Sequence, residues 1–168
     1  SFPDQELISR SVPAWVSEQT KVTAGWARAL QTEPTLWLRA RPGTGPTLAR
    51  KLGSARFASE VLRGAGASAL SGRPRPGPPD GAPNAGSRLR DALLYEGGED
   101  LFRTPEFHAG EFEIQDLSSQ AVSWLCDPQP GETWWDVCAG EGGKTLHLAD
   151  LMQNKGLIWA TDRAAWRL

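Results

Sequence analysis

The sequence predicts an α/β fold that contains the first strands of a Rossmann-like parallel sheet. An apolar run at 133–137 leads into a glycine-rich turn, and a helical pattern follows at 146–152. A second apolar run comes next, at 157–161, as expected when a helix connects two parallel strands. Asn154 and Gly156 lie just before it, and such residues commonly end a helix. We therefore expect this part of the chain to be built on parallel strands.

A small α+β domain is predicted over residues 1–70. Ser11 can cap a helix spanning 11–30, which carries apolar residues at helical spacing. Residues 35–40 alternate as a strand does, and 46–64 have an interrupted helical pattern. A strand followed by a helix suits a small nucleic-acid-binding unit. This prediction rests on the order of the elements and not on a geometric argument.

Residues 71–90 are predicted to form a flexible loop, and 91–168 a truncated Rossmann-like domain. The segment 71–86 contains five prolines and four glycines. Such a composition buries too little apolar area to offset the entropy lost on ordering. Beyond the loop, a helix is expected at 116–125 before the first parallel strand.

Charge is distributed unevenly along the chain. Residues 36–90 carry ten Lys or Arg and two acids, whereas 111–168 carry four basic and nine acidic side chains. A basic block beside an acidic one suits an enzyme that binds nucleic acid, because phosphates attract Lys and Arg. A solvated surface explains the same block equally simply. With no apolar run of about 20 residues and no secretion signal, we expect a cytoplasmic protein that does not span a membrane.

The turn after the first parallel strand has the features of a nucleoside-cofactor site. It comprises Cys138, Ala139, Gly140, Glu141, Gly142, Gly143 and Lys144. Its glycines allow backbone N–H groups and a helix N-terminus to approach a charged ligand closely. The second strand ends in Asp162, whose carboxylate can accept hydrogen bonds from both hydroxyls of a ribose.

Three classes of cofactor compete for this turn. A phosphate-binding P-loop would place its first glycine at Cys138, where a side chain obstructs the loop. A dinucleotide fingerprint would place its third small residue at Thr145, leaving only a weak glycine pair. The third class is a methyl donor.

Five elements of the chain favour the methyl donor. They are Gln115-Asp116-Leu117-Ser118-Ser119-Gln120, Pro130-Gly131-Glu132, the glycine turn itself, Asp162, and Arg167-Leu168. In this order they resemble the Sun-type (RsmB-like) family of RNA cytosine-5 methyltransferases, over about a third of the chain. Residues 36–39 resemble the family's RNA-binding domain more loosely.

This resemblance implies a Rossmann-like methyltransferase domain that binds S-adenosyl-L-methionine. The cofactor would lie against residues 138–144, with Asp162 holding its ribose. Its carboxylate would favour the backbone amides and Lys144, and its ammonium and sulfonium would favour Asp136 or Glu141. The family usually has Ala-Pro where this chain has Gly140-Glu141, which removes a fixed φ and loosens the turn.

The resemblance further implies a substrate and a missing catalytic centre. The expected substrate is RNA, with ribosomal RNA as the expected class. The family's nucleophilic cysteine lies beyond the first two strands, so we expect a fragment and assign no catalytic residue. The alternative hypothesis is a nucleic-acid-binding module with a vestigial cofactor site. The sequence does not specify the oligomeric state, although the exposed edges of a partial sheet predict association.

The cysteines and tryptophans are predicted to be structural. Cys126 and Cys138 are expected to be buried and reduced, and with His108 and His147 they lack the spacing of a metal site. Eight tryptophans are present. Those in the predicted parallel strands (Trp134, Trp135 and Trp159) are expected in the core. Those nearer the N-terminus (Trp15, Trp26 and Trp37) are candidates for stacking on RNA bases if exposed.

Overall fold

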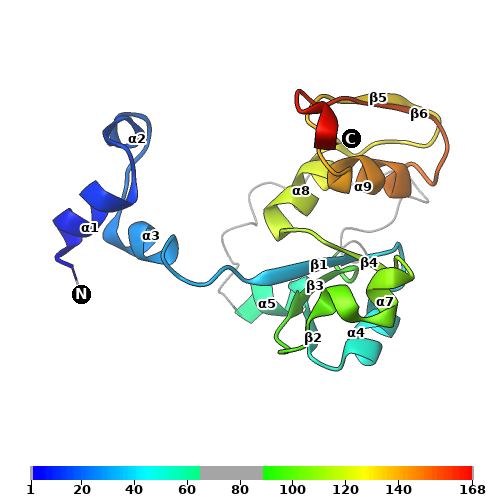
Figure 1. The fold of residues 1–168 in the computed structure, drawn as a ribbon, viewed down its shortest axis with the longest axis horizontal. Coiled ribbons are helices and arrows are strands. Elements are labelled where there is room, and N and C mark those ends of the chain that lie inside the picture. The colour runs from blue at the N-terminus through cyan, green and yellow to red at the C-terminus, as the bar shows by residue number, and fades with distance from the viewer. Residues whose placement is uncertain (1, 65–88, 168) are drawn as a thin grey trace. The chain divides into compact units, whose positions relative to one another are not determined.

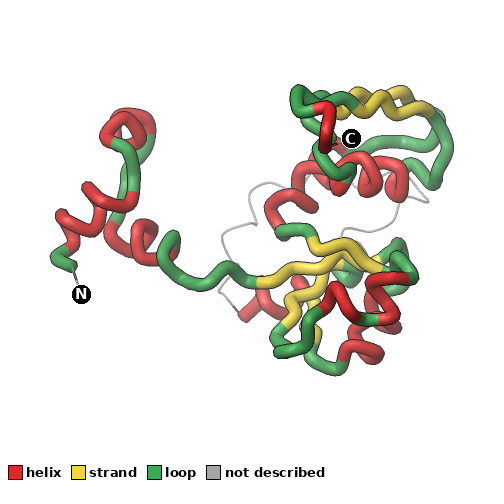
Figure 2. Tube along the Cα trace, in the orientation of Figure 1, coloured by secondary structure: helices red, strands yellow, loops and turns green. Residues whose placement is uncertain are grey.

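The computed structural model describes residues 2–64 and 89–167. Contacts divide the chain into two compact units, Ser1–Thr35 and Leu36–Leu168, which we describe separately. Apart from residues 89 and 90, the predicted loop at 71–90 lies outside the described residues. Figure 1 gives the element labels, and Figure 2 shows the same trace coloured by secondary structure.

The first unit contains three short helices: α1 (Asp4–Ser11), α2 (Ala14–Gln19) and α3 (Ala24–Ala29). The single helix predicted at 11–30 is therefore wrong. Ser11 ends α1 rather than capping a helix, and Pro13 precedes α2 as its N-cap. Thr23 starts α3, because its hydroxyl accepts a hydrogen bond from the Trp26 backbone N–H at 3.2 Å.

The second unit begins with a four-stranded antiparallel sheet. Its strands are β1 (Leu36–Ala40), β2 (Ala55–Phe57), β3 (Ala92–Tyr95) and β4 (Phe112–Ile114), in the order β2-β3-β1-β4. Leu38 in the central strand β1 pairs with Leu93 on one side and Ile114 on the other. Leu38, Leu93 and Phe112 are at most 1% exposed and lie in the core.

Short helices surround this sheet. They are α4 (Gly45–Leu52), α5 (Ala58–Gly64), the 3-10 helix η2 (Leu101–Arg103) and α7 (Pro105–His108). The predicted strand at 35–40 is confirmed as β1, whereas the pattern at 46–64 comprises α4, β2 and α5. The interruption falls at Gly53, which ends α4 with a φ of 69°. A glycine adopts this left-handed conformation without strain, so the chain can turn into β2.

The sheet draws its strands from both sides of the undescribed segment. β1 and β2 come from the predicted 1–70 domain, and β3 and β4 from the predicted 91–168 domain. The division by contacts, at Thr35, thus differs from the predicted one. A change in composition along the chain does not reveal which strands pair across the segment that carries it.

A β-α-β unit completes the described chain. Helix α8 (Leu117–Cys126) precedes β5 (Thr133–Asp136), and α9 (Gly143–Leu151) connects β5 to β6 (Leu157–Ala160). The two strands are parallel and pair Trp134 with Ile158 and Trp135 with Trp159. The 3-10 helix η3 (Ala165–Arg167) follows. The parallel pair and its connecting helix were expected from the sequence.

Exposure of several side chains overturns the prediction that they are structural core. Trp135 is 67% exposed and Trp159 61%, and both free cysteines, Cys126 and Cys138, are also exposed. The two tryptophans are paired in register, so they lie on the same face of a two-stranded sheet, which leaves that face open to solvent. Cys126 is the last residue of α8, and Cys138 lies in the turn after β5. Neither cysteine therefore lies in the middle of a helix or strand that other elements cover.

The tryptophans nearer the N-terminus differ in exposure. Trp15 is 63% exposed and Trp26 43%, whereas Trp37 in β1 is 8% exposed and packs in a small apolar cluster with Ala92 and Leu94. The condition for base stacking is therefore met by Trp15 and Trp26 and not by Trp37.

Gly45 allows α4 to approach the chain that enters β3. A Cβ atom at this position would lie 1.9 Å from the Arg90 carbonyl oxygen and 2.8 Å from its carbonyl carbon. We expect Gly45→Ala to lower the free energy of unfolding by about 1–3 kcal/mol, because backbone must move to relieve the overlap. Urea denaturation measures this loss.

Gly98→Ala provides the matched control, because no atom lies within 4 Å of a Cβ placed there. Equal stability of the two variants would show that α4 and the start of β3 are not packed as described.

Candidate functional site

The turn after β5 is held by Asp136. Its Oδ1 accepts a hydrogen bond from the Cys138 backbone N–H at 3.2 Å, and its Oδ2 accepts one from the Thr145 hydroxyl at 2.7 Å. Gly140 and Gly142 have φ values of 53° and 85°, in the left-handed region that favours glycine. The carboxylate thus joins the end of β5 to the first turn of α9 across a glycine-dependent backbone.

Asp162 lies directly against this turn. Its Oδ2 accepts a hydrogen bond from the Gly140 backbone N–H, and its Oδ1 accepts one from the Ala164 backbone N–H, both at 2.8 Å. These bonds, together with the nearby Arg167, lower the pKa of the Asp162 carboxyl below its ordinary value of 3.8. Each carboxylate oxygen has two lone pairs, so Asp162 can still accept hydrogen bonds from a ligand.

The other predicted residues of the turn lie between the end of β5 and the start of α9. The Ala139 backbone N–H donates to the Thr161 carbonyl at 3.0 Å, which ties the turn to the end of β6. Glu141 is exposed, whereas Gly143 and Lys144 are half-buried and open helix α9. A Cβ added at Gly142 would meet no atom within 4 Å. The structure therefore places residues 138–144 beside Asp162, with open space at Gly142.

Gln115 connects this region to the antiparallel sheet. Its Oε1 accepts a hydrogen bond from Arg39 Nε at 2.9 Å, and its Nε2 lies 3.6 Å from where a Cβ at Gly143 would be. Asp116 occupies the N-cap position of α8 without a side-chain capping bond, and its carboxylate instead accepts a hydrogen bond from the Ser118 hydroxyl. The predicted Gln115-Asp116 element thus supports the site through Gln115.

Sequence reasoning missed a buried ion pair. Arg39 Nη1 lies 2.5 Å from Asp150 Oδ2, and the Arg39 side chain is only 3% exposed. Arg41 Nη1 lies 3.4 Å from the same oxygen. Burial lowers the pKa of Arg39, and the hydrogen bond to Asp150 opposes this shift. The partners are 111 positions apart in the sequence, and only the fold brings Arg39 of β1 to Asp150 of α9.

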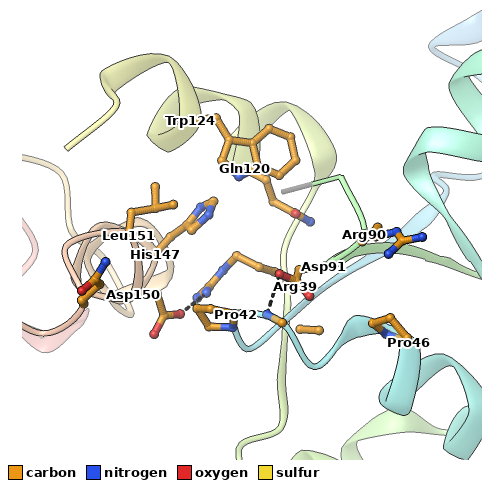
Figure 3. Close-up of a pocket in the computed structure, with 13 residues that line it drawn as sticks. Arg39, Pro42, Pro46, Arg90, Asp91, Gln120, Trp124, His147, Asp150 and Leu151 are labelled. Carbon is orange, nitrogen blue, oxygen red and sulfur yellow. Dashed lines mark hydrogen bonds and ion pairs between the residues drawn. The ribbon is translucent and has the colours of Figure 1, made fainter. Parts of the chain in front are cut away.

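A cavity of about 410 Å³ lies beside this ion pair (Figure 3). The sheet side of the cavity is lined by residues that include Arg39, Pro42, Pro46 and Asp91, and the helix side by Gln120, Trp124, His147, Asp150 and Leu151. None of residues 138–144 and not Asp162 lines it. It is therefore separate from the predicted cofactor turn.

Within residues 2–64 and 89–167, no group of three or more His, Cys, Asp or Glu side chains could hold a metal ion. In the same described part of the chain, no helix combines the length and apolar character needed to cross a bilayer.

Comparison with known proteins gives a family match for the C-terminal part of the chain. Residues 123–168 match the family model described as 16S rRNA methyltransferase RsmB/F. This part of the chain is therefore similar to the RsmB/F methyltransferase family. The match includes the turn, α9 and Asp162, and it confirms the resemblance drawn from the motifs.

Relatives with assigned names agree with this family. Over 68 residues the chain is 48% identical to a probable ribosomal RNA small subunit methyltransferase B of Synechocystis, covering 40% of this chain and 15% of the relative. Over 70 residues it is 40% identical to a 26S rRNA (cytosine-C(5))-methyltransferase of Caenorhabditis elegans, covering 42% and 10%. The chain thus matches only a small part of the length of these relatives.

A solved structure extends the likeness beyond the matched segment. A methyltransferase homologue from Pyrococcus horikoshii aligns with a TM-score of 0.69 and 21% identity, covering 99% of this chain and 50% of that chain. At this identity the likeness shows the fold alone. It confirms the α/β, Rossmann-like fold predicted from the sequence.

Proposed function

We propose that this chain is part of an S-adenosyl-L-methionine-dependent RNA cytosine-5 methyltransferase that acts on ribosomal RNA. The observation that carries the proposal is the contact between Gly140 and Asp162, which brings the glycine turn and the acid after β6 into one site. The RsmB/F match over the same residues supports the choice of a methyl donor over ATP or NAD. We also propose the cytoplasmic location expected from the sequence.

The residues of the turn fit the chemical groups of this cofactor. Asp162 would accept hydrogen bonds from the ribose hydroxyls, while the start of α9 and Lys144 would attract the carboxylate. Asp136 is half-buried and holds the turn together, whereas Glu141 is exposed, so Glu141 is the better partner for the ammonium group. When bound, the cofactor supplies the methyl group for transfer. The chain's own residues position that group, and we assign none of them a catalytic role.

Methylation at carbon 5 of cytosine needs a nucleophile, usually a thiolate, to add at carbon 6 first. Cys126 and Cys138 are exposed, and Cys138 lies within the turn itself. Among the described residues, no hydrogen bond pairs either thiol with a side chain that could act as its base. We therefore propose that a segment outside residues 1–168 supplies the nucleophile.

We propose that the antiparallel sheet and the helices around it contribute to RNA binding. Arg50 and Arg63 are exposed on α4 and α5, and they donate hydrogen bonds to neutral oxygens of Thr47 and Ser59. Their charges are therefore free of a carboxylate partner in those bonds and can attract phosphate. By contrast, Lys51 pairs with Glu111 at 2.6 Å.

One observation favours a second candidate. Both Asp162 oxygens accept backbone hydrogen bonds, so this carboxylate can hold the turn together without any ligand. In that case the chain would be a nucleic-acid-binding module whose cofactor site is vestigial.

Titration calorimetry with S-adenosyl-L-methionine, ATP and NAD separates these candidates. We expect heat of binding with S-adenosyl-L-methionine and none with ATP or NAD. Binding of ATP alone would support a P-loop, and binding of NAD alone a dinucleotide enzyme. If the folded chain bound RNA and none of the three cofactors, the vestigial-site candidate would replace the proposal.

A further inference from the structure

Two buried polar side chains in the wall of the 410 Å³ cavity hold atoms that lack partners. Arg39 is 2% exposed and Gln120 0%. Within the described part of the chain, Arg39 Nη2 and Gln120 Oε1 have no hydrogen-bond partner. Both atoms are shielded from solvent, so bulk water does not satisfy them either. Such groups are rare in native proteins, and a bound water or ligand is a common explanation.

The identity of the unpartnered atoms is fixed by their neighbours. Gln120 Nε2 donates to the Gln115 carbonyl at 2.8 Å and to the Leu38 carbonyl at 3.3 Å. Both partners are acceptors, so the amide nitrogen must face them and the oxygen is left over. Arg39 uses Nε for Gln115 and Nη1 for Asp150, which leaves Nη2. These two side chains therefore leave one donor and one acceptor unpaired beside the cavity.

The charges around the cavity favour a neutral ligand. Two cationic side chains, Arg39 and Arg90, are balanced by two carboxylates, Asp91 and Asp150. Asp150 is bound to Arg39, and Asp91 accepts the backbone N–H groups of Gly43 and Gly45 at 2.8 and 2.9 Å. A phosphate or carboxylate would meet no net positive charge here.

The remaining lining favours a flat aromatic ligand. Trp124 and His147 lie edge to face, with ring centroids 5.9 Å apart and planes at 83°. Pro42, Pro46 and Leu151 supply apolar surface. A volume of about 410 Å³ falls within the range of about 300–1,000 Å³ that is typical of small-molecule sites.

We propose that this cavity binds a single nucleobase, separately from the cofactor turn. A nucleobase is planar and neutral, and its Watson–Crick edge places an acceptor beside a donor. Once side-chain movement uncovers the two shielded atoms, the acceptor would take the Arg39 Nη2 hydrogen and the donor would reach Gln120 Oε1, while the ring packs against Trp124. The base-binding chemistry depends on the cavity alone; that the base belongs to an RNA strand rests on the proposed function.

Titration with uridine and cytidine, followed by NMR on the Trp124 indole signal, tests this proposal. We expect a saturable shift that 3-methyluridine, which lacks the donor for Gln120, does not produce. Leu151→Trp should fill the cavity and weaken nucleoside binding at least tenfold. Leu146→Trp is its matched control, because Leu146 lies on the same helix, is 40% exposed and does not line the cavity.

A second variant guards against misfolding of the first. Trp124→Leu removes the stacking partner. Titration calorimetry, which does not need the Trp124 signal, should show binding weakened at least about fivefold, as expected for loss of one base–aromatic contact. Trp135→Leu, at an exposed position outside the cavity, should leave binding unchanged. Urea denaturation would confirm that each variant is folded.

Three results would overturn the proposal. They are the absence of nucleoside binding, equal binding of ribose 5-phosphate, and nucleoside binding that Leu151→Trp and Trp124→Leu leave intact. A short RNA strand that loses affinity when one nucleotide is made abasic would identify RNA as the source, and equal affinity would point to free nucleosides. Leu151→Trp should still bind S-adenosyl-L-methionine. Cofactor binding therefore tests the proposed function, and nucleoside binding tests the cavity.

Discussion

Asp150→Ala is expected to lower the free energy of unfolding by about 3–5 kcal/mol, the usual result of breaking a buried ion pair. The substitution leaves the Arg39 guanidinium, 3% exposed, without its anionic partner. It also removes the carboxylate near Arg41, so two cations lose a shared counter-charge. Urea denaturation followed by tryptophan fluorescence measures the loss.

The exposed pair Lys51–Glu111 supplies the control. Its side chains are 41% and 34% exposed, so solvent screens the interaction, and Glu111→Ala should cost no more than about 1 kcal/mol. Equal losses in the two variants would contradict burial of Arg39. The double variant Arg39→Met with Asp150→Leu should recover much of the stability lost in Asp150→Ala, because no uncompensated charge remains.

Asp162→Asn is expected to weaken the binding of S-adenosyl-L-methionine about 100-fold, through loss of the charged acceptor for two ribose hydroxyls. The substitution also turns an amide N–H₂ group toward the backbone N–H of Gly140 or Ala164, which disturbs the turn. Titration calorimetry measures the change in affinity.

Glu132→Gln is the matched control for Asp162→Asn. Its carboxylate also accepts a backbone hydrogen bond, from Gln129, and its pKa is likewise lowered, but it lies before β5 and away from the turn. It should leave affinity unchanged. An undiminished affinity in Asp162→Asn would show that Asp162 is structural and that the cofactor is held elsewhere.

The lowered pKa of Asp162 also gives a pH dependence. Because the folded-state pKa lies below the ordinary value of 3.8, ionisation of this group stabilises the folded turn above that pH. The stabilisation is lost as pH falls through the folded-state pKa. Cofactor affinity should therefore hold down to about pH 4, as far as Asp162 controls it.

Local patterns predicted those parts of the structure that depend on neighbouring residues. The glycine turn, the two parallel strands and helix α9 follow from apolar runs and from glycines that permit positive φ, as Gly140 and Gly142 show. The single helix predicted at 11–30 was wrong because new helices begin inside it, α2 after Pro13 and α3 after the capping residue Thr23.

Nonlocal packing was beyond the reach of sequence reasoning. Arg39 reads as one basic residue among ten, and only its position in β1 opposite α9 makes it a buried partner of Asp150. Trp135 and Trp159 lie in apolar runs that suggested burial, yet pairing of just two parallel strands leaves their shared face exposed. Burial depends on what covers a strand, which the strand's own sequence does not encode.

The most direct test of the account is to map backbone amide signals by NMR while S-adenosyl-L-methionine is added to the chain. We predict saturable shifts concentrated at residues 138–144 and at Asp162, with the amides of β1 to β4 largely unchanged. Saturable shifts confined to other residues, with those of the turn and Asp162 unmoved, would contradict the assignment of this site to the methyl donor.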